Sequence, residues 1–575
     1  MSDPNPSPTI DYGRHTNRAD VLIIGAGISG MTTAIEMIRK GNGTNFIIVE
    51  KGNQVGGTWN DQRYPGCCCD VWSHLYSLSF EPNPNWTREY PGQEEILDYL
   101  VSIAHKYQLY RHIRFNTSVE EARWDETTNT WKTKINRLGS KDSEFGKEYI
   151  ITSDFLVSGV GQLNVPKYPD IKGIDTFQGK AMHSARWDWD YDIRKKRIGI
   201  IGNGATAAQI IPEIAEACKS LTVFQRTPNW VVPREDKPIS PTWQSIYRYV
   251  PFIRSRYRAS LMDYRESFFD VVFDTKSPVH DFMMSTSKDH LATQLPGEKH
   301  EHLREQLQPH YAIGCKRVII TDDYFPTFAR SNVQLETTAI EEITENGVKV
   351  QGGNEHELDL LILATGFKTT QFMYPIKIFG SNGTPIEEIW KSGASAYLGM
   401  TVPSMPNFSM LYEGPNTNLG HNSIILMIEA QALYINALIK QVRTARKKGR
   451  NVRIEPKLSV VQAYNNEIQA RLRESAFADP NCNSWYKNEA GLITNNWSEA
   501  VVPYQKRTSA IHWDEFDISG SGAEDVKTKG ETNWPRVIEE TQVSNGMILT
   551  GLITAAGAIT AGALYRNALK TLVKS

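Results

Sequence analysis

The sequence lacks an excess of charge of either sign. Its 575 residues include 63 lysines and arginines against 65 aspartates and glutamates, which gives a formal net charge of −2. Proteins that bind nucleic acids carry a marked basic excess or a basic patch. We therefore expect no nucleic-acid partner.

Cysteine is scarce, and its spacing does not suit pairing or metal binding. Three of the six cysteines are adjacent, Cys67–Cys69, and no C-x-x-C spacing occurs in the chain. Adjacent cysteines cannot readily pair with one another, and the other three are scattered, so we expect neither a disulfide framework nor a zinc site. This composition fits a reduced, intracellular, cytoplasmic setting, and we assign no redox-active thiol to the run.

Long apolar runs are also rare. The first nineteen residues are polar, without the apolar segment of a secretory signal. Gly546 to Tyr565 is free of charge and is followed by Arg566, Lys570 and Lys574. This run is long enough to cross a bilayer, although glycine and threonine dilute it. Two interpretations stay open: a membrane-associated tail, and a small-residue helix packed on the protein's own surface.

One sequence pattern occurs twice: a short apolar run, a glycine-rich turn, a helical pattern and a second apolar run. Such a strand–turn–helix–strand unit is a βαβ unit with a buried parallel sheet. Because the chain is too long for one hydrophobic core, we predict an α/β fold with two Rossmann-like dinucleotide-binding domains. The first unit comprises Val21–Ile24, the turn Gly25–Gly30 and Phe46–Val49; the second comprises Arg197–Ile201, the turn Gly202–Ala207 and Leu221–Phe224.

The first turn has the residues that a dinucleotide requires. Gly25 permits a tight turn after the strand, Gly27 lets the backbone approach a pyrophosphate, and Gly30 lets the helix pack closely on the strand. Glu50 ends the next strand, where a carboxylate accepts hydrogen bonds from ribose hydroxyls and repels a 2′-phosphate. This turn therefore favours FAD or NAD.

The second turn differs at the end of its next strand. There Arg226 and Thr227 stand in place of an acid. A guanidinium and a hydroxyl at this position suit a 2′-phosphate, so the second site favours NADPH. Two sites with different nucleotides are expected if electrons pass from NADPH to a bound flavin.

The remaining patterns divide the chain. Apolar residues recur at helical spacing between the second unit and residue 311, which indicates a helical insertion. The stretch 476–535 lacks clear periodicity and is predicted to be a mobile loop. The predicted segments are an FAD-binding domain (1–160), an NADP-binding domain (161–234), the helical insertion (235–310), the second part of the NADP-binding domain (311–365), the second part of the FAD-binding domain with the loop (366–540) and an apolar tail (541–575).

Three further motifs resemble those of type I Baeyer–Villiger monooxygenases. Gly56-Gly57-Thr58-Trp59 with Tyr64-Pro65-Gly66 and Asp70 resembles the segment after that family's first nucleotide turn. Phe177-x-Gly179-x-x-x-His183-x-x-x-Trp187-Asp188 resembles its fingerprint, with every fixed position filled, and Ala364-Thr365-Gly366 resembles its strand-to-linker turn. The resemblance extends from about residue 20 to 515 and implies oxidation of ketones to esters or lactones by FAD, NADPH and O2, through a C4a-peroxyflavin.

The resemblance also implies which residues act. Catalysis in the family rests on an arginine oriented by an aspartate, and the matching positions are Arg317 and Asp70; a permanent positive charge there can stabilise a developing anion. For FAD the matching residues are Gly25, Gly27, Ser29, Gly30, Glu50, Thr58, Trp59, Asn60, Asp61, Asp70, Tyr76, Val119 and Ile424, although Asn60-Asp61 departs from the family's usual residues. For NADP they are Cys68, Cys69, Gly202, Asn203, Gly204, Ala205, Thr206, Ala207, Ala208, Arg226, Thr227, Lys316, Arg317 and the loop tryptophan Trp485.

Several alternatives stay open at this point. His183 is either a proton donor or, as for most histidines between domains, a residue that couples them. A related flavin monooxygenase would oxygenate nitrogen or sulfur, and has no comparable need for Arg317. A disulfide reductase would need a paired thiol beside the flavin, and no C-x-x-C is present. A flavin-binding membrane or redox-sensing module without turnover is the last alternative.

Overall fold

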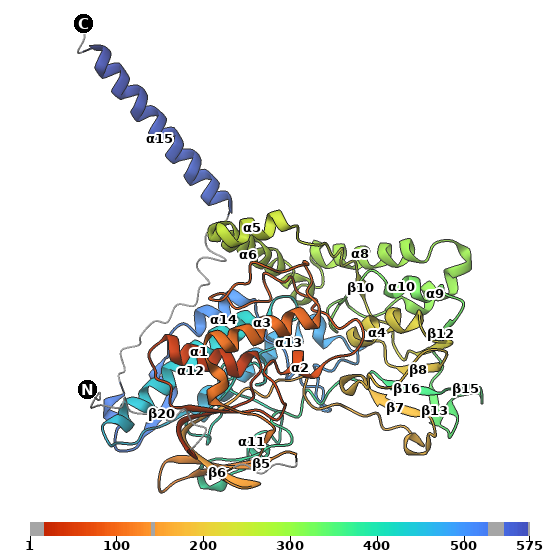
Figure 1. Cartoon of the computed structure of the whole chain (residues 1–575), viewed down its shortest axis with the longest axis horizontal. Helices are drawn as coiled ribbons and strands as arrows, with labels where there is room; N and C mark the ends of the chain where they lie inside the picture. Colours follow the sequence, from red (N-terminus) through yellow and green to blue (C-terminus); the bar gives the residue numbers. More distant parts are fainter. Residues whose placement is uncertain (1–15, 140–143, 527–544, 573–575) are drawn as a thin grey trace, which may run out of the picture.

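The computed structural model describes residues 16–139, 144–526 and 545–572, with side chains up to 564. Two β-sheets, each with parallel strands at its centre, lie side by side (Figure 1). A long helix extends away from the rest of the molecule near α5 and α6. The larger sheet has the order β17-β4-β5-β6-β1-β2-β3, with β18 beside β6. Its strands are β1 (Arg18–Ile24), β2 (Phe46–Val49), β3 (Ile113–Arg114), β4 (Thr117–Asp125), β5 (Thr130–Arg137), β6 (Glu148–Ser158), β17 (Lys377–Phe379) and β18 (Phe408–Met410).

The predicted first βαβ unit forms the centre of this sheet. Strand β1 pairs in parallel with β2 and with β6. All four residues of β2 and the last four of β1 are buried, as continuous apolar runs in parallel sheets require. Helix α1 (Ile28–Arg39) packs against the long buried helix α12 (Ile424–Lys447). The other helices of this part are α2 (Thr58–Asp61), α3 (Gln93–Lys106), α11 (Ile386–Ile389) and α13 (Leu458–Arg473).

The second βαβ unit forms a five-stranded, all-parallel sheet. Its order is β12-β9-β8-β16-β7, and α4 (Ala205–Ala215) follows the glycine-rich turn. Gly202 has φ 109°, and a Cβ there would lie 2.4 Å from the carbonyl oxygen of Ala364 at the end of β16. Only glycine fits between these two strand ends. The strands are β7 (Lys180–His183), β8 (Arg197–Ile201), β9 (Ser220–Phe224), β12 (Val333–Glu336) and β16 (Leu360–Leu363).

Helices occupy the predicted insertion. Five helices follow one another between residues 241 and 307, and α10 (Tyr324–Thr327) comes after them. Two small sheets complete this half: β10 (Val231–Val232) with β11 (Ile319–Ile320), and β13 (Ile340–Ile343) with β14 (Gly347–Val350) and β15 (Glu355–Glu357). The five helices are α5 (Pro241–Tyr249), α6 (Pro251–Glu266), α7 (Phe269–Phe273), α8 (Pro278–Gln294) and α9 (Glu301–Leu307).

The stretch 476–526 is more regular than the sequence predicts. Helix α14 (Val501–Arg507) and strand β20 (Phe516–Ser519) lie within it. Strand β20 pairs antiparallel with β19 (Arg453–Pro456), more than 50 residues earlier in the chain. A local pattern cannot reveal such pairing, because the partner strand supplies the hydrogen bonds. The rest of the predicted loop, 527–535, lies outside the described residues.

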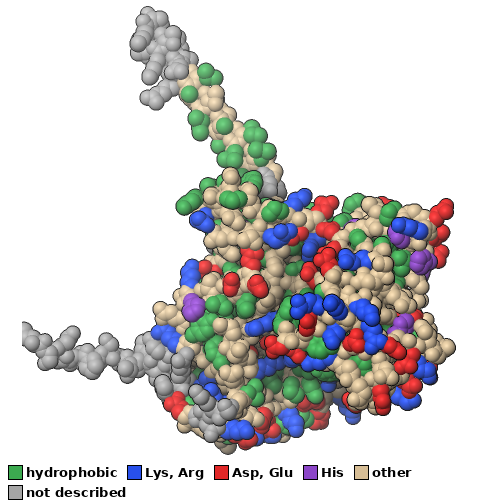
Figure 2. All heavy atoms as spheres, turned by 45° about the vertical axis from the view of Figure 1, so that its right-hand side comes forward, with side chains coloured by type: hydrophobic (Ala, Val, Ile, Leu, Met, Phe, Trp, Pro, Cys, Tyr) green, Lys and Arg blue, Asp and Glu red, His purple; other side chains and the backbone are tan. Residues whose placement is uncertain are grey.

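The apolar tail forms a helix that stands away from the body (Figure 1). Helix α15 comprises Asn545–Leu572, and its described side chains are almost all exposed. Hydrophobic side chains cover it along its described length (Figure 2). Most of residues 546–564 are therefore not packed on the protein's own surface, although Ile548, Leu549 and Leu552 at the start of the helix line a cavity with residues of α5 and α6. Two described helices are long and apolar enough to cross a membrane, this one and α12, of which α12 is mostly buried.

Candidate active site

The first glycine-rich turn has the shape that a pyrophosphate needs. Helix α1 begins after Gly27, and within the described chain no side chain caps its N-terminus. A Cβ at Gly30 would lie 1.9 Å from the carbonyl oxygen of Gly25, so the helix can pack on the turn only with glycine there. Free N–H groups at a helix N-terminus bind phosphate. The residues present therefore fit the pyrophosphate of FAD.

Glu50 holds this turn in place. Its buried carboxylate accepts hydrogen bonds from the backbone N–H groups of Ala26 and Gly52, both at 2.7 Å. Burial raises the pKa of Glu50, and the two backbone hydrogen bonds oppose this rise. A carboxylate has about four acceptor sites. Two bonds to the turn thus leave capacity for ribose hydroxyls.

The other residues predicted to contact FAD come from several elements of the larger domain. Thr58, Trp59, Asn60 and Asp61 form the short helix α2, and the Trp59 indole N–H donates to the hydroxyl of Tyr76 at 3.1 Å. Ser29 is buried in the first turn of α1, Val119 lies on β4, and Ile424 is the first residue of α12. Asn60 accepts a hydrogen bond from Arg63, so its departure from the family's residues has a structural role.

The second glycine-rich turn is also bare at its helix N-terminus. Helix α4 begins after Gly204, and no side chain of the described residues caps its N-terminus. Ala207 and Ala208 lie in its first turn and are buried. The amide of Asn203 ties the turn to the neighbouring strand end by donating to Gln225 and to the carbonyl of Thr227, both at 2.9 Å. Ala205 and Thr206 form the first turn of α4, and the geometry therefore suits a second pyrophosphate.

Two cations beside this turn, Arg226 and Lys316, lie close enough for their charges to repel one another. Arg226 is exposed, and the half-buried Lys316 places its Nζ 4.8 Å above the ring of Tyr311. Burial, and after it repulsion from Arg226, lowers the pKa of Lys316 to about 8. Two cations that repel one another, one of them partly buried, are expected where an anion binds between them. This arrangement fits the 2′-phosphate of NADPH.

The lowered pKa of Lys316 predicts pH-dependent NADPH affinity. Below about pH 8 the ammonium is charged and attracts the 2′-phosphate; above it the neutral amine does not. The KM for NADPH is therefore expected to rise from neutral pH to about pH 9, while that for NADH, which has no 2′-phosphate, stays flat. Lys316→Met should raise the KM for NADPH about tenfold at neutral pH and remove this dependence. Lys299→Met is the control; an unchanged profile in Lys316→Met would refute the assignment.

The segment around the cysteine run crosses from one nucleotide domain to the other. The hydroxyl of Tyr64 donates to the side chain of Gln209 on α4 at 2.9 Å, and the Gln209 amide donates to the carbonyl of Cys68 at 3.1 Å. The thiol of Cys68 accepts from Arg234, and Cys69 is buried. Burial raises the pKa of both thiols. Neither thiol is activated as a nucleophile.

Asp70 and Arg317 meet between the two domains. The carboxylate of Asp70 accepts hydrogen bonds from both Nε and Nη2 of Arg317, each at 2.7 Å. The two residues form a bidentate ion pair although 247 residues separate them in the sequence. Burial raises the pKa of Asp70, but the charge and hydrogen bonds of Arg317 outweigh it and keep that pKa below the usual value. Asp70 likewise holds the pKa of Arg317 above its usual value in spite of burial. Both groups are therefore charged at neutral pH.

The same guanidinium also reaches the start of α12. Nη1 of Arg317 lies 3.4 Å from the carbonyl oxygen of Leu419 and 3.2 Å from that of Gly420. Two segments distant in the sequence, at Asp70 and at Leu419–Gly420, thus fix the orientation of Arg317. The buried Tyr486 lies close enough to Arg317 and Asp70 for their charges to act on its hydroxyl. The predicted pair is brought together, at the place where both domains and α12 converge.

Sequence reasoning missed two residues of this cluster. Arg265 donates to the carbonyl of Asp70 at 2.7 Å and lies over the ring of Trp72. Glu266 accepts from the amide of Asn422 at 2.9 Å and lies 3.3 Å from the ring of His421, both in the turn that opens α12. These two residues belong to the helical insertion and have no motif of their own, so no signal in the sequence marks them.

The expectation of no disulfide is wrong at one pair. Cys315 and Cys482 are bonded, across 167 residues of sequence. The backbone N–H of Ala312 donates to the carboxylate of Asp479 at 2.7 Å beside them. Scattered cysteines gave no sign of pairing because folding, rather than spacing, brings the two segments together. The bond joins the residue before Lys316 and Arg317 to the predicted loop.

Breaking this bond is expected to lower stability. Cys482→Ser should reduce the free energy of unfolding by about 2–4 kcal/mol, because the unfolded chain gains freedom when the long loop is opened. Thermal melting of the flavin-loaded enzyme with and without a dithiol reductant measures it: the reductant should lower the wild-type melting temperature towards that of the variant. Cys218→Ser replaces a buried free cysteine and serves as control. Equal melting of wild type and Cys482→Ser without reductant would contradict the prediction.

Two predicted residues lie apart from these clusters. Trp485 is 39% exposed, its ring contacts that of Tyr486 in a tilted arrangement, and its carbonyl accepts a hydrogen bond from the hydroxyl of Thr369. Neither neighbour belongs to the second glycine-rich turn. His183 ends β7, beside Leu363 of β16, and its ring contacts Tyr168 and Phe367. Burial lowers the pKa of His183, and its packing between linker residues favours the coupling of domains over proton donation.

Comparison with known proteins agrees with this geometry. A model of the flavin-binding monooxygenase-like family matches residues 18–444. The FAD-binding monooxygenase ktnD of Aspergillus niger is 48% identical over 96% of this chain and 90% of its own length. A Baeyer–Villiger monooxygenase of Streptomyces coelicolor is 37% identical over 87% of this chain and 92% of its own.

Solved structures are similar over the same range. The structure of OTEMO in complex with FAD and NADP superposes with a TM-score of 0.75 at 28% identity, covering 87% of this chain and 99% of that one. Cyclohexanone monooxygenase from Rhodococcus sp. Phi1 bound to NADP+ gives 0.74 at 25% identity, with the same coverage. Helix α15 lies beyond the residues that the family model matches.

Proposed function

The chain belongs to the flavin-binding monooxygenase-like family, and on this premise we propose that it is a Baeyer–Villiger monooxygenase. It would bind FAD and NADPH and use O2 to convert ketones to esters or lactones. The observation that carries this proposal is the bidentate pair of Arg317 and Asp70, which also contacts the start of α12. Oxygenation of nitrogen or sulfur has no comparable need for such an arginine.

We assign the two cofactors to the two glycine-rich turns. FAD would lie on Gly25–Gly30 with its ribose at Glu50, between α1, α2 and the start of α12. NADPH would lie on Gly202–Ala208 with its 2′-phosphate at Arg226, Thr227 and Lys316. Together the cofactors supply a hydride and the activation of O2. The segment with Cys68 and Cys69 contacts α4, which supports a place for the nicotinamide beside its backbone.

Arg317 is the proposed catalytic residue, and Asp70 positions it. The guanidinium keeps its charge and stabilises negative charge that develops on the substrate's carbonyl oxygen. The Asp70 carboxylate fixes the plane of the guanidinium, so little reorganisation is needed when that charge appears. The helix N-terminus at Ile424 adds a positive dipole end to the same place. Tyr486 and the disulfide-tethered loop would exclude water.

A substrate panel tests the proposal. Purified enzyme loaded with FAD is given NADPH with linear, cyclic and aryl ketones, and with sulfides in parallel, and products are analysed by mass. Ketones should accelerate NADPH oxidation and yield products one oxygen heavier. Oxygenation of sulfides alone would favour the nitrogen- or sulfur-oxygenating class. No NADPH oxidation with any compound would favour a flavin-binding module without turnover.

We also propose an intracellular, cytoplasmic enzyme whose helix α15 binds a membrane. The exposed, uncharged residues Gly546–Leu564 support this proposal. Two aspartates at the middle of the segment, Ile553→Asp with Ile559→Asp, should move the protein from the membrane to the soluble fraction of lysed cells, because each central charge opposes insertion by about 2.5–3.5 kcal/mol. A distribution unchanged from wild type would refute membrane binding by α15.

A further inference from the structure

The tip between α5 and α6 exposes large apolar side chains that have no core to enter. Tyr249 is 76% exposed and Phe252 60%, and Trp243, Val250 and Ile253 are exposed beside them. Pro251 begins α6 directly after α5 ends, so the chain turns sharply and presents these residues at its corner. We call Trp243, Tyr249, Val250, Phe252 and Ile253 the α5–α6 surface. A contiguous group of this kind marks an interaction site.

The helical segment that carries this surface has only positive charges, while Glu89 from the larger domain also lines the cavity beside it. Residues 241–262 include four arginines and neither aspartate nor glutamate. One of them, Arg258, is buried and donates to the carbonyls of His74, Leu75 and Ser77, which fastens α6 to the larger domain. The other three, Arg248, Arg254 and Arg256, are at least partly exposed. Aromatic residues interleaved with arginines are typical of helices that lie in a membrane interface.

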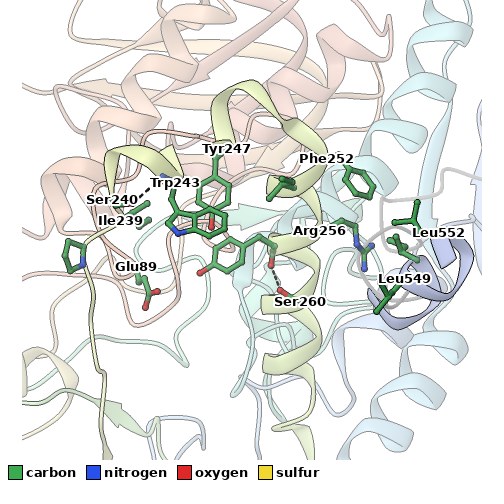
Figure 3. Close-up of a pocket in the computed structure, with 14 residues that line it drawn as sticks. Glu89, Ile239, Ser240, Trp243, Tyr247, Phe252, Arg256, Ser260, Leu549 and Leu552 are labelled. Carbon is green, nitrogen blue, oxygen red and sulfur yellow. Dashed lines mark hydrogen bonds between the residues drawn. The ribbon is translucent and has the colours of Figure 1, made fainter. Parts of the chain in front are cut away.

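The α5–α6 surface lies where α15 leaves the body. A cavity of about 680 Å³ is lined by Phe252, Ile253 and Arg256 together with Ile548, Leu549 and Leu552 of α15. Figure 3 shows Leu549 and Leu552 on the same side of the cavity as Phe252 and Arg256. Hydrophobic side chains also gather at the base of α15 in the space-filling view (Figure 2). The two apolar features are therefore continuous.

The length of α15 places the α5–α6 surface at a definite depth. Its 19 residues Gly546–Leu564 rise about 28 Å along the helix, close to the thickness of a hydrocarbon core of about 30 Å. If α15 crosses a bilayer, its first turns lie at the membrane boundary. Since Leu549 and Leu552 share a cavity with Phe252, the α5–α6 surface then lies at the same boundary. There, aromatic residues and arginines are the favoured side chains.

We propose that the α5–α6 surface is a second membrane contact, which docks into the headgroup region of an anionic phospholipid bilayer beside α15. The aromatic side chains enter the acyl boundary, and the partly exposed arginines of α5 and α6 lie at the level of the lipid phosphates. The cavity between the two elements is then filled by lipid. This inference rests on the proposed membrane binding of α15, and the experiment below separates the two. It does not depend on the identity of the ketone.

Flotation of the full-length, FAD-loaded enzyme with vesicles tests this contact. Vesicles of phosphatidylcholine alone are compared with vesicles that also contain phosphatidylglycerol. Tyr249→Ser with Phe252→Ser should weaken partitioning into both by about 10–100-fold, since two large apolar side chains no longer enter the boundary. Arg248→Gln with Arg256→Gln should weaken binding to the anionic vesicles alone, by about tenfold or more. Phe282→Ser with Leu458→Ser removes two side chains of similar exposure elsewhere and should leave partitioning unchanged.

The outcomes distinguish this contact from α15 and from catalysis. Partitioning of Tyr249→Ser/Phe252→Ser equal to that of wild type would overturn the contact. A wild-type dimer that this variant dissociates, seen by gel filtration without vesicles, would assign the surface to a second copy and also overturn it. If the Ile553→Asp/Ile559→Asp variant alone loses binding, α15 is the sole membrane contact, and this result would also contradict the proposal. Ketone turnover without vesicles should be the same in all variants, so its loss would concern the proposed reaction instead.

Discussion

Arg317→Ala is expected to lower the rate of ketone oxygenation by about 10²–10³-fold, the effect of removing one preorganised charge stabiliser from an active site. The guanidinium is bound at once to Asp70 and to the turn that opens α12. Alanine removes its charge and leaves the Asp70 carboxylate buried without a partner. The measurement is ester or lactone formed per unit time, with NADPH oxidation recorded in parallel.

Matched variants separate chemistry from folding in this experiment. Arg317→Lys retains the charge but not the bidentate geometry, and should recover part of the lost rate. Arg330→Ala removes a more exposed arginine of the same domain, whose ion pair with Glu216 is 3.6 Å long, and should have no effect. Bound FAD and melting temperature show whether each variant is folded. Full ketone turnover in folded Arg317→Ala would refute the assigned mechanism, and retained sulfide oxidation beside lost ketone oxidation would support it.

Asp70→Ala is expected to reduce the free energy of unfolding by about 1.5–3 kcal/mol, because it leaves a half-buried guanidinium without its counter-ion. Arg265 also loses part of its favourable surroundings, since the charge of the Asp70 carboxylate acts on it. Ketone turnover should fall together with stability, as Arg317 is no longer oriented. Asp70→Asn keeps one oxygen for Arg317 and should lie between the alanine variant and wild type. Thermal melting and turnover of the FAD-loaded variants measure both effects.

The contribution of Asp70 to stability has a definite pH dependence. Its pKa in the folded protein is lowered, so the stabilisation is present above the unfolded pKa of about 3.9 and is lost as pH falls through the folded value. The difference in melting temperature between wild type and Asp70→Ala should hence be constant from pH 5 upwards and shrink below about pH 4. Asp289→Ala, at an exposed position on α8, is the control. A difference that instead grows on acidification would contradict the ion pair.

With the proposed membrane contact, helix α6 of the insertion would have two roles: it supports the site at one end and contacts lipid at the other. One side of α6 carries Arg265 and Glu266, which contact Asp70 and the turn that opens α12. The other end carries the α5–α6 surface beside α15. If the surface docks as proposed, binding to lipid and the geometry of Arg317 share a helix that Arg258 fastens to the larger domain. Comparing ketone turnover with and without anionic vesicles shows whether docking affects the site.

The two nucleotide domains could be predicted from the sequence because their signals are local. Apolar runs form the buried parallel strands β1, β2, β8 and β9 where predicted. The glycines stand where the backbone has positive φ or where two backbones nearly touch, as at Gly202 and Gly30. The contrast between Glu50 and Arg226 concerns single side chains at strand ends. Each of these features depends on neighbours within a few dozen residues, so the sequence displays it directly.

Only the tertiary structure decided which distant residues meet. Asp70 and Arg317 were proposed from a resemblance, and their pairing is a contact between two domains. The bond of Cys315 to Cys482, the roles of Arg265 and Glu266, and the pairing of β20 with β19 had no signal in the sequence. A charge or thiol acquires its partner through the packing of whole elements, which spacing along the chain does not encode. The sequence by itself determined the two folds and what each binds best; packing decided how they form one site.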